Sequence, residues 1–352
     1  MESAGYRVVH AIENDAVAVE TLNLNRRRYF PSLPEVQAQD ITGLDPEFVM
    51  DRLRVKRGDI ALLVGGPPCV AFSKSGFHLD YKRQGLDRRA DLLTDYLRFL
   101  EALEPTAFVM ENVFGLAYKN QSAVVYSRLR AKIERLGYSF CDAVLNAADY
   151  GVPQNRQRLF VIGARDRRQL DHPLATHWGE HERRRPPSNV YLLSPHVSAG
   201  QALAHLSSDP EQSDAVNGKW GHLLPEIPPG RNYLHFTRHE GHPRPIFEWR
   251  SRYWTFLLKL DPNRPSPTLQ GQPGPYVGPF HWENRRLRIP ELKRLHGFPN
   301  DYAFAGTRRG IQLQIGNSVP PLLADRVASA VLAQTKDLVR TSPESAQGIL
   351  QL

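Results

Sequence analysis

The chain lacks the features that mark secreted, membrane-embedded and metal-stabilised proteins. Its 352 residues include two cysteines, Cys69 and Cys141, which are too few for a disulfide framework. No Cys/His pair has zinc-like spacing, so the sequence predicts no metal site. No apolar run approaches the roughly 18 residues of a membrane span, and no signal peptide is expected at the N-terminus. A reducing cytoplasm is therefore the expected location.

Positive charge is the most telling feature of the composition. Lysine and arginine outnumber acidic residues by 45 to 37, which gives a net charge of +8 and a pI near 9.5. Such an excess serves solubility in some proteins. Here, however, arginines cluster at 183–185, 285–288 and 308–309 and are interleaved with aromatic residues and histidines. This arrangement favours contact with the phosphates of a nucleic acid.

One candidate site follows a short apolar run. Residues 59–64 predict a strand buried on both faces, and it leads directly into Gly65-Gly66-Pro67-Pro68-Cys69. Open α/β sheets bind ligands at the carboxyl ends of their strands. Glycines allow close approach of the backbone and prolines fix its angle, so this loop would aim the Cys69 thiol. Taken alone, the stretch is equally typical of a proline-rich turn with a buried cysteine.

A carboxylate follows the next predicted strand. Residues 107–110 are apolar, and Glu111 comes directly after them. Burying a carboxylate is costly unless it has a partner or a function. Glu111 is therefore either salt-bridged at the sheet edge or a working residue beside Cys69, and its place at a neighbouring strand end favours the second interpretation.

Two arginines precede a further buried strand, predicted over 159–163. In an extended segment, alternation places Gln154, Arg156 and Arg158 on one side. Two guanidinium groups there could hold a carboxylate, a phosphate or a base carbonyl, although surface arginines at a strand start remain an alternative.

Several polar residues are candidates for binding a nucleoside. Glu13 and Asn14 end a strand predicted over 6–12, where an acidic residue can bind ribose hydroxyls. Asp40 and Ile41 either end a short strand beside an adenine ring or form a turn cap. Asn317, with the next residue, is expected to cap the last helix, 322–338, near the cofactor.

The order of elements predicts an α/β fold. Helical patterns over 16–25, 91–103 and 122–136 alternate with the buried strands. Residues 74–89 are polar and without helical period, which indicates a loop that closes over a substrate. Residues 165–263 are rich in Pro, His, Arg and Trp and have little regular pattern.

In this order, the motifs resemble those of DNA cytosine-5 methyltransferases. The resemblance rests on Pro-Pro-Cys69, Glu111-Asn-Val, Gln154 to Arg158, residues 288–299 and Gly-Asn317-Ser-Val. It implies a Rossmann-like, S-adenosylmethionine-dependent methyltransferase sheet with a smaller, irregular target-recognition domain. We expect a catalytic domain over 1–164 and a target-recognition region over 165–263 that continues to about 310. Residues 311–338 would return to the catalytic domain, with a tail over 339–352.

The resemblance also implies a role for each motif residue. Cys69 would add as a thiolate to C6 of a flipped-out cytosine, Glu111 would engage N3, and Arg156 and Arg158 would hold the base carbonyl and orient Glu111. Because Glu111 or N3 must carry a proton, a raised Glu111 pKa is expected. S-adenosylmethionine would be bound by the residues Glu13, Asn14, Asp40, Ile41, Pro68, Leu92, Asn317 and Val319.

The sequence departs from this family at its start. Family members open with a strand and a Phe-x-Gly-x-Gly-Gly turn. No such turn precedes Glu2 in this sequence, and none recurs after Leu338. We expect a shortened form of a longer protein, with two sheet edges left unpaired. The expected partners are duplex DNA and a cognate restriction endonuclease, and the expected state is a monomer. An inactive DNA-binding remnant and an RNA cytosine-5 methyltransferase remain alternatives.

Overall fold

A six-stranded mixed sheet forms the core of one half of the molecule. The computed structural model describes residues 1–67, 92–118, 123–179, 192–206, 214–249, 253–338 and 348–351. Its strand order is β1-β10-β2-β3-β6-β4, with the first four strands parallel and β6 antiparallel to both of its neighbours. The α/β class predicted from the sequence is confirmed. The strands are β1 (Arg7–Ala11), β2 (Leu62–Gly65), β3 (Ala107–Val113), β4 (Ser139–Asn146), β6 (Gln157–Ala164) and β10 (Gly348–Gln351).

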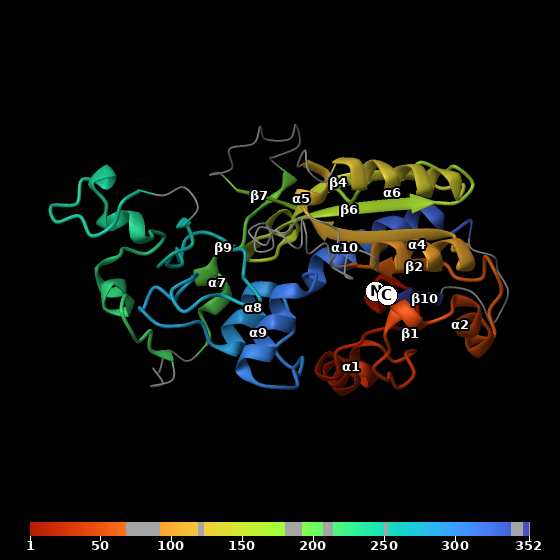
Figure 1. Ribbon diagram of the computed structural model, residues 1–352, viewed down its shortest axis with the longest axis horizontal. Helices are drawn as coiled ribbons and strands as arrows, with labels where there is room; N and C mark the ends of the chain where they lie inside the picture. Colours follow the sequence, from red (N-terminus) through yellow and green to blue (C-terminus); the bar gives the residue numbers. More distant parts are fainter. Residues whose placement is uncertain are drawn as a thin grey trace.

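Alternation along the strands divides the core between the two faces of the sheet. On β3, Phe108 and Met110 point to one face, where they pack against α2 (Pro46–Leu53), α4 (Leu92–Leu103) and α6 (Ala123–Arg135). Ala107 and Val109 point to the other face, which α10 (Pro321–Thr335) covers (Figure 1). Burying each large apolar side chain contributes about 1.5–3 kcal/mol, so the central strands and their carboxyl ends are firmly placed. No helix in the described ranges is long and apolar enough to cross a bilayer.

The central position between β1 and β2 is filled by β10, from the other end of the chain. Val8 and Leu62 both pair with Ile349, and both ladders are parallel. Figure 1 accordingly shows the N- and C-termini side by side. The sequence predicted a tail over 339–352 and two unpaired sheet edges at this place, and in both respects the structure differs. The physical reason is that strand pairing uses backbone groups, so a short segment distant in sequence can pair with both edges.

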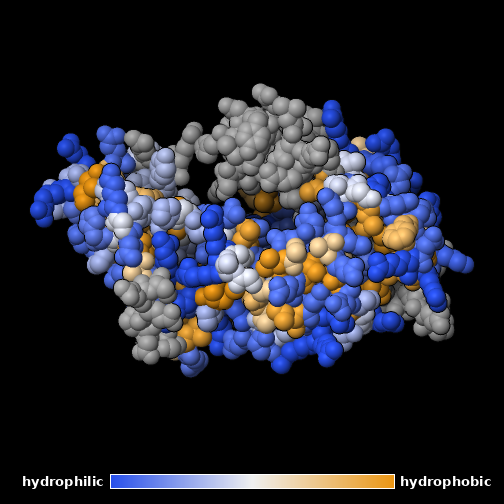
Figure 2. Space-filling model, turned by 60° about the horizontal axis from the view of Figure 1, so that its bottom comes forward, coloured by the Kyte–Doolittle hydropathy of each residue, from blue (hydrophilic) through white to orange (hydrophobic). Residues whose placement is uncertain are grey.

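The other half of the molecule is irregular, as its composition predicted. Described elements there are mostly single turns, which surround an aromatic cluster that includes Tyr233, Phe236 and Phe280. Helices α8 (Ile289–His296) and α9 (Arg308–Asn317) join this half to the sheet, and the surface is hollowed between the two halves (Figures 1 and 2). The remaining elements are α1 (Ala16–Tyr29), α5 (Gly115–Tyr118), α7 (Ala199–Leu203), β5 (Gln154–Asn155), β7 (His177–Trp178), β8 (Ser194–Pro195) and β9 (Ser266–Pro267), with the 3-10 turns η1 (Glu2–Ala4), η2 (Ile41–Gly43), η5 (Ala147–Tyr150), η8 (Gly221–Glu226), η9 (Tyr233–Phe236) and η10 (Arg238–Glu240).

Candidate active site

The site is built on an ion pair between two neighbouring strands. Glu111 on β3 and Arg158 on β6 are diagonal neighbours across the ladder, where Glu111 pairs with Phe160 and Arg158 with Val113, and 2.9 Å separates Glu111 Oε1 from Arg158 Nε. Their side chains are only 15% and 16% exposed, so little water screens the pair. Burial raises the pKa of Glu111, and the nearby guanidinium groups of Arg158 and Arg156 offset only part of that increase. This direction agrees with the raised pKa that the sequence predicted.

The backbone leading to Cys69 begins beside Glu111. Asn112 donates a hydrogen bond from Nδ2 to the Pro67 carbonyl, at 2.9 Å. Gly66 is packed so closely that a Cβ atom there would lie 3.3 Å from Glu111 Oε2. Pro68, Cys69 and the loop predicted over 74–89 lie outside the described residues. The described part therefore places the start of the cysteine loop against the candidate acid.

Arg156 is fully buried and has a different set of partners from Arg158. Its Nη2 donates to the carbonyl oxygens of Gly316 and Ser318, at 2.8 and 3.0 Å. Burial, followed by repulsion from Arg158, lowers the pKa of Arg156 to about 9, so it remains charged at neutral pH. Its Nε and Nη1 have no hydrogen-bond partner among the described residues. Arg156 therefore fixes the turn that carries Asn317, and of the two arginines it is Arg158 that forms the ion pair with Glu111.

A buried histidine connects the arginine segment to the same turn. His296, on α8, is fully buried; its Nδ1 lies 3.1 Å from the Nε2 amide of Gln154, and its Nε2 lies 3.1 Å from the Ser318 carbonyl oxygen. An amide nitrogen can only donate and a carbonyl can only accept, so the ring is neutral with its proton on Nε2. Gln154 is held in turn by Leu269, whose N–H donates to Oε1 at 3.2 Å. The sequence contained His296 within a motif but gave no sign of this role.

Acid should weaken the fold through His296. Burial, and then repulsion from Arg156, lowers the pKa of His296 well below 6.5, so the unfolded chain binds a proton that the folded chain does not. Stability is then lost as pH falls below about 6.5, by at most about 1.4 kcal/mol per pH unit for one group. We expect His296→Gln to be less stable than wild type at pH 7, because a buried partner is lost, but to show a smaller fall in Tm between about pH 7 and about pH 5.

Thermal unfolding followed at several pH values checks this expectation. The matched control is His205→Gln at an exposed position, which should leave Tm at pH 7 unchanged. A pH dependence in His296→Gln as steep as that of wild type would contradict the assignment.

The candidate nucleoside-binding residues at the start of the chain lie close together. Glu13 follows β1 and is half-buried, Asn14 is exposed, and the Glu13 carbonyl accepts a hydrogen bond from Gln39 N at 2.8 Å. That bond brings Asp40 and Ile41 to the end of β1. Asp40 does not end a strand: it caps η2, accepting from Thr42 N and Oγ1, and these bonds lower its pKa. Asp40 therefore forms a turn cap, and the proximity of Asp40 and Ile41 to an adenine ring stays a prediction.

The remaining cofactor candidates come from two other elements. Leu92 begins α4, and Val319 packs against the core on the α10 side of the sheet. Asn317 does not cap the last helix as predicted: it ends α9, and α10 begins at Pro321 without a side-chain cap. Gly316 lies so close to Gly271 that a Cβ there would be 2.3 Å from Gly271 N, which explains why this turn needs glycine.

The sequence did not predict the role of two supporting residues, Arg98 and Asn146. Arg98 on α4 donates to the carbonyls of Ile41 and Leu44, at 2.8 and 2.5 Å, and so holds the segment after Asp40. Asn146 Oδ1 accepts from Arg156 N at 3.0 Å. An apolar pattern cannot reveal such contacts, because each joins a polar side chain to the backbone of a separate segment.

Comparison with known proteins agrees with this geometry. Residues 1–333 match the model of the family described as C-5 cytosine-specific DNA methylase. The type II methyltransferase M.SacI of Streptomyces achromogenes is 44% identical over 339 residues, which cover 93% of this chain and 84% of the relative. M1.HphI of Haemophilus parahaemolyticus is 30% identical over 342 residues, covering 94% and 82% of the two chains.

Solved structures support the fold. A DNA modification methyltransferase encoded within an E. coli prophage matches with a TM-score of 0.60 at 20% identity, covering 95% of this chain and 94% of that one. DNMT2 of Spodoptera frugiperda matches with a TM-score of 0.58 at 16% identity, covering 94% and 93%. The chain thus belongs to the C-5 cytosine-specific DNA methylase family and is a DNA cytosine-5 methyltransferase of the type II restriction–modification kind.

Proposed function

We propose that the enzyme methylates C5 of a flipped-out cytosine within a specific duplex DNA sequence, through a covalent adduct with Cys69. The observation that carries the proposal is the buried Glu111–Arg158 pair beside Pro67, the residue that leads into the cysteine loop. C5 of cytosine is a weak nucleophile. Addition of a thiolate to C6 would convert the ring into an enamine and make C5 reactive.

The protein's residues would divide the chemistry as follows. The Cys69 thiolate forms a bond to C6 while N3 gains a proton, for which Glu111 is placed. Arg158 holds Glu111 in position, and Arg156 holds the turn at Asn317. After methyl transfer, a base removes the C5 proton, the C6–S bond breaks to release the Cys69 thiolate, and N3 returns its proton to the Glu111 carboxylate. The target base must leave the helical stack first, at a cost of a few kcal/mol.

S-adenosylmethionine fits the residues at the ends of β1 and β2 as methyl donor. The Glu13 carboxylate is half-buried at a strand end, where it can accept from ribose hydroxyls, and Ile41 is held beside it as an apolar surface for adenine. Asn14, Asp40, Pro68, Leu92, Asn317 and Val319 would complete the site. When bound, the cofactor supplies an electrophilic methyl group.

The relatives support action on a defined sequence, because the matched proteins are named as type II methyltransferases. We propose that residues 165–263 and their continuation read that sequence, that the enzyme acts as a monomer, and that a cognate restriction endonuclease is its partner. Base edges in the major groove would be the features that are read.

Expression of this chain in a host without cytosine methylation tests the proposal. Sequencing the host DNA for 5-methylcytosine should show methylation confined to one short motif. The control is Cys69→Ser, which should bind DNA but leave it unmethylated. Methylation by Cys69→Ser would overturn the covalent mechanism. Absence of methylation by the wild type, with DNA binding retained, would favour a DNA-binding remnant. Methylation found in RNA alone would favour the RNA alternative.

A further inference from the structure

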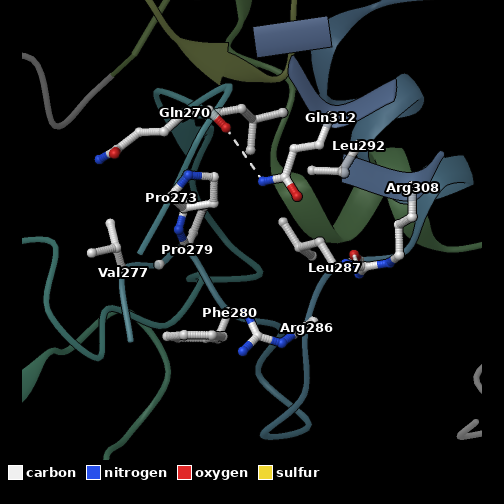
Figure 3. Close-up of a pocket in the computed structure, with 12 residues that line it drawn as sticks. Gln270, Pro273, Val277, Pro279, Phe280, Arg286, Leu287, Leu292, Arg308 and Gln312 are labelled. Atoms are coloured by element: carbon white, nitrogen blue, oxygen red, sulfur yellow. Dashed lines mark hydrogen bonds between the residues drawn. The ribbon is translucent and has the colours of Figure 1, made fainter. Parts of the chain in front are cut away.

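A small pocket away from Glu111 carries two arginines and an apolar floor. It lies where the irregular half meets α8 and α9, and Arg286 and Arg308 lie on the side opposite Val277 (Figure 3). Its cavity of about 30 Å³ is too small for a nucleobase, and Arg308 is exposed, so a larger anion would lie at the mouth of the pocket and not inside it. The apolar lining is Leu269, Pro273, Val277, Pro279, Phe280, Leu287 and Leu292.

The two arginines differ from their neighbours in having no acidic partner in the pocket. Arg285 is bound to Glu291, with 2.7 Å between Nη2 and Oε1, and Arg288 to Asp214, with 2.6 Å between Nε and Oδ2.

Arg286 and Arg308 have other partners. Arg286 donates to the Pro275 carbonyl at 3.1 Å, and Arg308 donates to the Leu287 carbonyl at 2.6 Å. None of the described residues lining the pocket is acidic. Arg285 and Arg288 are thus neutralised by carboxylates, whereas Arg286 and Arg308 have only carbonyl oxygens as hydrogen-bond acceptors among the described residues.

The positive charges of Arg286 and Arg308 favour the binding of an anion between them. Burial lowers the pKa of Arg286, and the positive charge of Arg308 lowers it further, so the two guanidinium groups repel each other. A shared anion would relieve that repulsion. Each guanidinium carries five N–H donors in a planar fork suited to phosphate oxygens. Arg308 also begins α9, where the helix dipole favours negative charge.

The position of the pocket relates it to the proposed site. Gln270 and Gln312 line it, and the Gln312 amide donates to the Gln270 carbonyl at 3.3 Å (Figure 3). The next residue, Gly271, packs against Gly316 and Asn317. An anion seated here is therefore coupled to the Asn317 turn through short, rigid contacts.

We propose that Arg286 and Arg308 together bind one phosphate of the DNA backbone. The inference rests on the proposed function, because it takes duplex DNA as the substrate that approaches the Asn317 turn. Such a contact would position the duplex without reading its sequence.

Binding of labelled duplexes at several salt concentrations tests the proposal. Arg286→Gln and Arg308→Gln should each weaken binding about tenfold, equally for cognate and unrelated sequences. The slope of log affinity against log salt should fall by about 1. The double variant should lose less than the sum, because both side chains would serve one phosphate.

Arg309→Gln is the matched control, since Arg309 is the next residue, exposed and outside the pocket lining. Loss of affinity no greater than in Arg309→Gln would overturn the proposal. A second measurement compares the stabilisation of the protein by inorganic phosphate with that by chloride at equal ionic strength. If phosphate stabilises the wild type but not the variants, and DNA affinity is the same in all of them, the pocket binds free phosphate and the proposal is overturned. If wild type binds DNA but transfers no methyl group, the proposed function fails, and the salt slopes still decide this inference.

Discussion

Glu111→Gln is expected to slow methyl transfer roughly a thousandfold while leaving DNA affinity nearly unchanged. The amide keeps the size of the carboxyl group but cannot deliver a proton to N3. Burial raises the pKa of Glu111, so ionised Glu111 is less favourable in the folded than in the unfolded chain, and the Gln amide oxygen can still accept from Arg158 Nε, which limits any loss of stability. The expected loss is therefore one of chemistry and not of folding.

The pH profile provides a second readout. In wild type, the protonated fraction of Glu111 falls as pH rises through its raised pKa, while the Cys69 thiolate fraction grows, so the rate should pass through a maximum. In Glu111→Gln the alkaline decline should disappear and the acidic limb should remain. Single-turnover rates between about pH 5 and about pH 9 check this. Glu101→Gln, which removes an exposed partner of Lys132, is the control and should leave the rate unchanged.

An unaltered single-turnover rate in Glu111→Gln would remove Glu111 from the mechanism. If Glu111→Gln lowered the melting temperature so far that the unfolded fraction accounted for the lost activity, Glu111 would instead have a structural role.

The sequence was most informative where a buried strand meets a polar residue. The apolar run before Glu111 predicted β3, and the alternation from Gln154 to Arg158 is seen in their burial. These features are local: a strand buried on both faces must be apolar, and a charge at its end stands out. The α/β class followed from the same signals.

Contacts between distant segments could not be predicted in this way. The partners of Arg156 lie 160 and 162 residues away along the chain. The turn at Gly316 depends on backbone packing against Gly271, and α9 was not predicted as a helix. No local periodicity encodes such pairings, because they are fixed only when the two halves of the chain meet.

The most consequential of these long-range pairings is that of β10, and it yields the second large prediction. Leu350 pairs with His10 on β1 and with Leu63 on β2, so β10 has neighbours on both sides. Proline at this position removes a backbone donor and does not fit a central strand. We expect Leu350→Pro to lower the free energy of unfolding by about 3 kcal/mol or more. Urea unfolding followed by circular dichroism measures this change.

Leu350→Val is the matched control, since it keeps the N–H group and suits a strand. Deletion of 348–352 should be at least as damaging as Leu350→Pro, because both β1 and β2 would lose a neighbour. Unchanged urea midpoints in both variants would show that β10 does not support the sheet. Glu13 follows β1 and Gly66 follows β2, so losing β10 should also disturb cofactor binding. Activity and stability should therefore fall together in Leu350→Pro, whereas in Glu111→Gln activity should fall alone.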